Sequence, residues 1–140
     1  MERPGAKVLF SSADYPGAIP DHLVATASAA EDTEAMQRLV NAWYMTLDYI
    51  DEHPDEAVTI MSDKAGITPE EYAEFEAGTT IFSAEDALDA FGDRPDDPTS
   101  LVYMAGQINP FLVESGLAEE EADLDGLFAP QYTEAYVKGG

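Results

Sequence analysis

The chain has 140 residues, 45% of them hydrophobic and 10% aromatic, so it is long enough to bury about two thirds of the surface that its unfolded form exposes. Its 29 acidic residues against 6 basic ones give a formal net charge of -23, which repels nucleic-acid phosphates and anionic membrane surfaces. This charge suits either a salty medium, as in a halophilic source, or ordinary solubility. The absence of cysteine excludes disulfides, thiolate metal sites and cysteine nucleophiles.

Two short apolar runs, residues 8–10 and 23–26, are the strand-like parts of the sequence. Runs of this length that are rich in β-branched and aromatic residues are typical of strands buried on both faces. Turn residues fill the stretch between them and prevent regular structure there. Because two strands alone do not make a stable sheet, we expect them either to pair with each other and with a second copy or to belong to a larger protein.

The rest of the chain, from residue 29 onward, has a helical pattern. The first long helix is predicted to start with Ser28 and Glu31 as a capping box, or with Asp32 or Thr33 as the cap instead. A single apolar stripe with steps of three and four residues then runs along a helix of about 18 residues. The stripe consists of Met36, Leu39, Val40, Trp43, Leu47 and Ile50.

Capping residues, helix-start prolines and terminal glycines predict four further helices. Pro110 lies inside the last of them, and we expect a kink or a break at residues 107–109. The four helices run from Pro54 to Gly66, from Thr68 to Phe75, from Ser83 to Phe91 and from Pro98 to Gly116. The tail after them supplies apolar residues that are expected to dock: Leu127, Phe128, Tyr132, Tyr136 and Val137.

Five segments follow one another from about Lys7 to Val137: SSADYPGAIPDHLVAT, NAWYMTLDYIDEHPDEA, GITPEEYAEF, GTTIFSAEDALDAF and DLDGLF. In order and approximate spacing they resemble the C-terminal part of the substrate-binding proteins of nitrate/sulfonate/taurine-type ABC importers. The resemblance implies an α/β but predominantly helical fold. This would be the C-terminal portion of a type II periplasmic-binding-protein architecture, with one or two strands and about six helices.

The same resemblance implies that residues 1–140 form a single incomplete unit. Residues 1–28 would be a strand, a hinge loop and a crossover strand, and residues 29–140 would be helices that pack on a first lobe absent from this chain. The implied function is that two lobes close on a small anionic or zwitterionic solute, such as a sulfonate, nitrate or taurine, and present it to an ABC permease. The implied location is extracytoplasmic, in the periplasm or as a cell-surface lipoprotein, although the sequence shows no signal peptide.

The alternative function is a stand-alone helical module that binds other proteins or self-associates through residues 8–10, with no small-molecule ligand. Candidate ligand-binding residues for the importer function are Ser11, Ser12, Asp14 and Tyr15. Hydroxyl groups and backbone N–H groups at the end of a strand suit an oxyanion, and Asp14 suits the ammonium group of a zwitterion. The alternative interpretation is that Ser11, Ser12 and Asp14 are turn residues that hydrogen-bond to their own backbone.

No enzyme, cofactor or metal site is predicted. The sequence has no Ser-His-Asp signature and no glycine-rich phosphate loop. His22 and His53 are far apart and lack further ligands at a recognisable spacing. Trp43 can form an aromatic wall for a ligand, but its position on the apolar stripe favours packing in the core.

Overall fold

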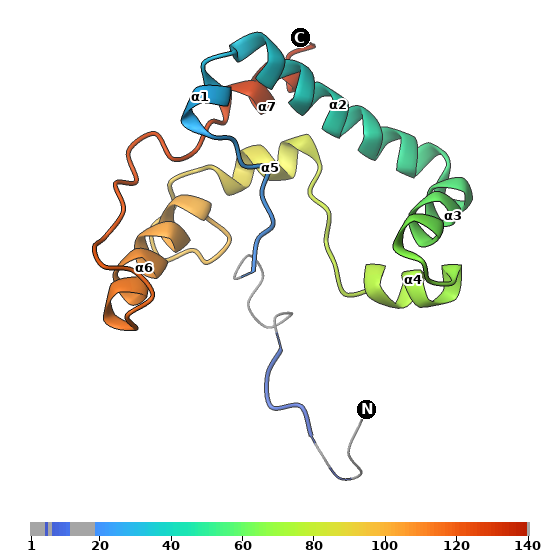
Figure 1. The fold of residues 1–140 in the computed structure, drawn as a ribbon, viewed down its shortest axis with the longest axis horizontal. Coiled ribbons are helices and arrows are strands. Elements are labelled where there is room, and N and C mark those ends of the chain that lie inside the picture. The colour runs from blue at the N-terminus through green and yellow to red at the C-terminus, as the bar shows by residue number, and fades with distance from the viewer. Residues whose placement is uncertain (1–4, 6, 12–18, 140) are drawn as a thin grey trace. The chain divides into compact units, whose positions relative to one another are not determined.

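The computed structural model describes residues 5, 7–11 and 19–139, which form seven helices joined by turns and irregular segments (Figure 1). It divides into two compact units. The α6 unit comprises the described residues up to Val24 together with Asp89–Ala129, and the α2 unit comprises residues 25–88 and 130–139. The helices are α1 (Ala27–Ala30), α2 (Thr33–Glu52), α3 (Pro54–Ala65), α4 (Pro69–Glu76), α5 (Ala84–Ala90), α6 (Leu101–Glu114) and α7 (Gln131–Val137).

Neither predicted strand is found in the described residues, so this part of the fold prediction needs correction. Val8, Leu9 and Phe10 have no regular structure and are 84%, 90% and 73% exposed, whereas the prediction required burial on both faces. Residues 23–26 are also exposed, and Thr26 is the cap of α1 rather than the end of a strand. A strand needs a neighbour for its backbone N–H and C=O groups, and neither segment pairs with one within the described ranges. The predominantly helical character of the chain is confirmed.

Short-range hydrogen bonds identify the N-cap residues of α1 and α2. The side chain of Asp32 accepts a hydrogen bond of 2.9 Å from the backbone N–H of Ala35, so Asp32 is the cap of α2 among the three alternatives. Ser28 instead lies within α1, a short helix that the sequence pattern did not predict separately. The start of the long helix is therefore correct to within a few residues.

The boundaries of α3 and α4 agree with the predictions from proline, glycine and capping residues. Pro54 is the first residue of α3, and Gly66 ends it with a left-handed φ of 72°, a conformation that favours glycine. Thr68 and Glu71 form a reciprocal capping box at the start of α4: each backbone N–H bonds to the other side chain, at 3.2 and 2.9 Å. The backbone N–H of Thr68 and then its hydroxyl donate hydrogen bonds to the Glu71 carboxylate, and these lower the pKa of Glu71.

Helix α6 does not break before Pro110 as predicted, but continues to Glu114. Proline removes one intrahelical hydrogen bond, the one to the carbonyl of Gly106, and this exposed glycine has open space around its backbone. Near the end of α6, the Asn109 side chain bonds to both backbone polar groups of Ala122, at 2.8 and 2.9 Å. This pair, the Asn109 clamp, fastens the acidic segment that follows α6 to the helix.

Two predicted tail residues dock by aromatic contacts, each within one unit. In the α6 unit the Phe128 ring lies 5.9 Å from that of Phe91, and in the α2 unit the Tyr136 ring lies 4.9 Å from that of Tyr44. Leu127, by contrast, is 56% exposed. The tail therefore packs through its aromatic side chains more than through its aliphatic ones.

The loop between α5 and α6 is held by a network of polar side chains. Asp97 accepts hydrogen bonds from the Thr99 hydroxyl at 2.6 Å and from Nε of Arg94 at 2.7 Å. Ser100, whose side chain is fully buried, caps α6 by accepting from the N–H of Tyr103 at 3.2 Å and donates to the carbonyl of Gly92 at 2.7 Å. This loop is thus a closed hydrogen-bond network that sets the start of α6.

We predict that the Asp97 network stabilises the α6 unit above acidic pH. The hydrogen bonds from Thr99 and then Arg94 lower the pKa of Asp97 from 3.8 to about 2 in the folded chain. A lowered folded pKa gives stabilisation that is complete above the unfolded pKa near 3.8 and is lost as the pH falls through about 2. Asp97→Asn should lower the melting temperature at pH 7 and reduce its dependence on pH between those two values, as measured by circular dichroism.

The matched control is Asp96→Asn, which removes the same charge one residue away. Asp96 is exposed and has a φ of 63°, a left-handed conformation that asparagine tolerates well. Equal shifts in the two variants would show that overall charge, and not the Asp97 network, sets the acid stability.

Candidate functional site

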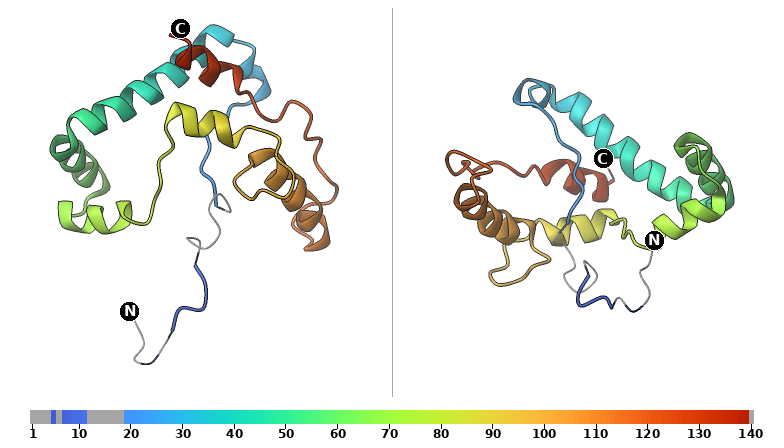
Figure 2. Two further views of the ribbon diagram at one scale, coloured as in Figure 1. Left: turned by 180° about the vertical axis from the view of Figure 1, so that it is seen from behind. Right: turned by 60° about the horizontal axis from the view of Figure 1, so that its bottom comes forward.

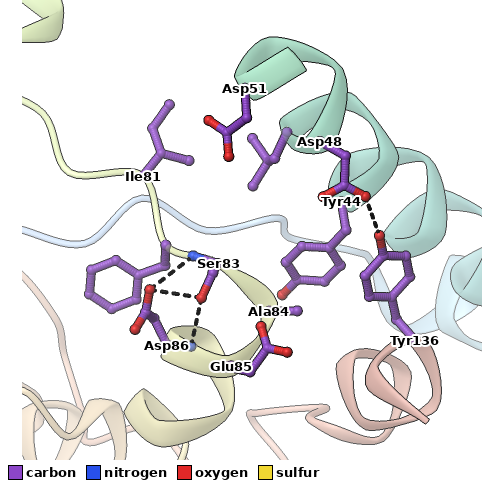
Figure 3. A pocket seen from close by; sticks show the side chains of 11 residues that line it. Tyr44, Asp48, Asp51, Ile81, Ser83, Ala84, Glu85, Asp86 and Tyr136 are labelled. Atoms are coloured by element: carbon purple, nitrogen blue, oxygen red, sulfur yellow. Dashed lines mark hydrogen bonds between the residues drawn. The ribbon is translucent and has the colours of Figure 1, made fainter. Parts of the chain in front are cut away.

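A pocket of about 320 Å³ lies in the α2 unit beside Tyr44 (Figure 3). One wall is α2, which contributes Tyr44, Leu47 and two aspartates. The opposite wall is the segment before α5 and the first turn of α5, and Tyr136 closes the side toward α7. The pocket therefore exists because α7 and the start of α5 both lie against one flank of α2.

The docking of α7 beside α2 builds this pocket (Figures 1 and 2). Tyr44 is 6% exposed, and its hydroxyl lies 3.2 Å from that of Thr133, which is also buried. The Tyr136 hydroxyl donates a hydrogen bond of 2.8 Å to Asp48, and this interaction raises the pKa of Tyr136. Nε2 of Gln37 donates to a backbone carbonyl of α7 at 2.9 Å. Three side chains of α2, spaced along one flank, thus hold α7.

The polar part of the pocket lining is dominated by carboxylates. Asp86 belongs to the predicted cap of α5, because it accepts hydrogen bonds from the N–H and the hydroxyl of Ser83 at 3.2 and 2.8 Å. Asp48, Asp51 and Glu85 complete the set of four. Among the described residues, none of the four forms an ion pair with lysine or arginine. Such a lining attracts cationic groups and repels anions such as nitrate or sulfonate.

Of the predicted ligand-binding residues, the structure describes Ser11, and Ser11 does not line this pocket. Ser11 is exposed and belongs to the α6 unit, whereas the pocket belongs to the α2 unit. Ser12, Asp14 and Tyr15 lie outside the described residues, so their predicted role stays a prediction. Tyr136, which lines the pocket, was predicted from the sequence to dock, but the pocket itself was not predicted. None of its carboxylates was predicted to bind a ligand, because the sequence is rich in acids throughout.

Trp43 is not buried in a core as predicted. It is 42% exposed, and its neighbour on the apolar stripe, Leu39, is 49% exposed. The buried flank of α2 is instead the one that carries Tyr44, about 100° around the helix from Trp43. The apolar stripe of α2 is consequently only half covered.

Each of the two histidines lies near an aromatic ring. The ring of His53 lies 4.6 Å from Tyr49, and that of His22 lies 6.5 Å from Phe128. In the described part of the chain no group of three or more histidines and acids is arranged to hold a metal ion. No described helix has the length and the apolar character that a membrane span requires.

We predict that Tyr44→Phe weakens the docking of α7. The change leaves the buried hydroxyl of Thr133 without its partner, at a cost of about 1 kcal/mol in the free energy of unfolding. Urea unfolding followed by circular dichroism measures the effect. Tyr132→Phe is the matched control, because it removes a hydroxyl from α7 that forms no hydrogen bond with the described residues. Equal stability of the two variants would contradict the role assigned to Tyr44.

Comparison of the chain with protein-family models, with curated proteins and with solved structures finds no match. The resemblance to importer substrate-binding proteins therefore stays a prediction, together with the solute, permease and location that it implies.

Proposed function

We propose that this chain is the C-terminal, mainly helical portion of the solute-binding protein of an ABC importer, and that its helices cover an apolar surface supplied by the rest of the receptor. The five ordered sequence segments support this assignment. One structural observation supports the assignment most strongly. The helices have amphipathic sequences, yet few of their large apolar side chains are buried. Among the described residues, the buried apolar side chains are those of Tyr44, Ala57, Ala84 and Ala90.

The uncovered apolar side chains lie on several helices of the α2 unit. Ile60 on α3 is 54% exposed and Phe75 on α4 is 69% exposed, in addition to Leu39 and Trp43 on α2. Full burial of one such side chain contributes roughly 1.5–3 kcal/mol. Apolar side chains left exposed on several amphipathic helices indicate that another surface covers them. Covering these helix faces would therefore stabilise the unit considerably.

In the proposed function the receptor holds a small anionic or zwitterionic solute between two lobes, closes about a hinge and presents the solute to a permease, without making or breaking a bond. The solute would bind between the lobes and not in the pocket beside Tyr44, because the carboxylates there repel anions. The chain alone is expected to bind taurine, sulfonates and nitrate more weakly than millimolar.

The second candidate is a helical module that docks on another protein or on itself. The exposure of Val8, Leu9 and Phe10 favours this candidate, because an exposed apolar segment whose backbone pairs with no strand in the described ranges can add to the edge of a sheet. Light scattering across concentration distinguishes the candidates. Reversible assembly of the pure chain that is abolished by Leu9→Lys would favour the module.

The test of the proposed function supplies the missing surface. The chain is mixed with a fragment of a nitrate/sulfonate/taurine-type receptor that retains both sheets but lacks its own C-terminal helices. We expect a one-to-one complex and recovery of solute binding by isothermal titration calorimetry, and Phe75→Asp should reduce complex formation strongly. The control, Glu74→Gln, changes an exposed side chain of the same helix and should have little effect. A chain that forms no complex with the fragment, yet assembles with itself, would contradict the proposal.

A further inference from the structure

The apolar stripe of α2 and the pocket beside Tyr44 meet at one residue. Leu47 belongs to the stripe and also lines the pocket, and Trp43 and Leu39 continue the stripe along α2. Across the pocket, the exposed side chains of Ile81 and Phe82 add a second apolar edge. We call this surface, formed by the stripe and the pocket, the α2 face.

The charged side chains that line the pocket of the α2 face are all acidic. The pocket has four carboxylates, Asp48 and Asp51 on α2 and Glu85 and Asp86 on α5 (Figure 3). Arg38 lies on the opposite side of α2, 180° from Leu47, and pairs with Glu34 at 3.2 Å. Lys138 pairs with Glu134 at 3.0 Å, and Arg94 belongs to the α6 unit, where it pairs with two aspartates. Within the described residues, the carboxylates of the α2 face therefore have no cationic partner.

We propose that the α2 face binds a polypeptide segment whose apolar side chains are flanked by lysine or arginine, and that one of these basic side chains enters the pocket. Its aliphatic stem would contact Ile81 and Phe82, and its cationic end would lie among the carboxylates near Asp51 and Glu85. The apolar side chains of the segment would cover Trp43. The inference rests on the proposed function, because it names the chemistry of the surface that covers these helices.

Charge complementarity distinguishes this occupant from the others that the α2 face could accept. A second copy of the chain carries the same net charge of -23 and brings carboxylates to carboxylates. A small amine would satisfy the pocket but leave Leu39 and Trp43 uncovered. A basic amphipathic segment both neutralises the carboxylates of the pocket and covers the apolar stripe.

The probe is a synthetic amphipathic helix of about 18 residues, with a leucine stripe flanked by lysines and without tryptophan. A matched peptide carries glutamate in place of each lysine. Trp43 is the only tryptophan of the chain, so a blue shift of its emission reports that the α2 face is covered. We expect the lysine peptide to bind at least about tenfold more tightly than the glutamate peptide, and less tightly as salt is raised.

Site specificity is tested with two double variants that each remove two negative charges. Asp51→Asn with Glu85→Gln should weaken binding of the lysine peptide by about fivefold or more, whereas Glu119→Gln with Glu120→Gln, in the acidic segment of the α6 unit, should change it less than about twofold. Circular dichroism confirms that both variants remain helical. Equal losses in the two variants, equal binding of the two peptides, or a stable dimer that excludes the peptide would each overturn the proposal.

The failure of this inference is distinguishable from the failure of the proposed function. If the receptor fragment binds the chain and the Asp51 and Glu85 double variant binds it equally well, the inference is overturned and the receptor assignment stands. If the lysine peptide binds with the expected specificity but the receptor fragment does not bind at all, the α2 face has a different basic partner and the receptor assignment is wrong.

Discussion

The α2 unit depends on the docking of α7 against the flank of α2 around Tyr44. Tyr44 is the one large side chain that is buried among the described residues, and its hydroxyl and ring contact Thr133 and Tyr136 of a helix almost ninety positions later in the chain. Without this contact the pocket would lose one of its sides. The remaining helices of the unit are held mainly by connections that are local in sequence, such as the caps of α2 and α4.

The docking of α7 uses a different flank of α2 from the one that its apolar pattern predicts. A helix can bury two flanks at once only if two surfaces are available, and α7, with seven residues, covers only one. The stripe that contains Trp43 is left for a second surface. Each proposal names a different cover for this stripe. The receptor proposal takes the cover from the rest of the receptor, and the module alternative takes it from another protein or a second copy. The further inference adds that the covering segment is basic.

The boundaries of α3, α4 and α5 were predicted well from the sequence, whereas long-range contacts were predicted poorly. Caps, helix-start prolines and terminal glycines act over a few residues, so Thr68, Ser83 and Gly66 could be assigned without any tertiary information. The predicted strands failed because a strand is defined by a neighbour, and composition alone does not supply one. The same reason applies to Trp43: periodicity identifies an apolar stripe, but it does not say whether this chain or another molecule covers it.

The candidate site was the least predictable part of the molecule. Its carboxylates come from α2 and α5 and its aromatic side chains from α2, α7 and the segment before α5, so that only the fold brings them together. Twenty-nine acidic residues in the chain make any one of them uninformative in sequence. The serines and aspartate chosen from the sequence were instead selected for their place in a turn, a local property.

The Asn109 clamp has a consequence for the most acidic part of the chain. Asn109 bonds to both backbone polar groups of Ala122, and the backbone N–H of Ala118 bonds to the carbonyl of Leu112, so the run of three glutamates at residues 119–121 is a short arch anchored at both ends. Proteases cut segments that can detach and extend into their active sites, and an anchored arch must first open. A glutamate-specific protease would cleave this run readily in a free tail. Because the backbone is anchored, the same protease should cleave it slowly here.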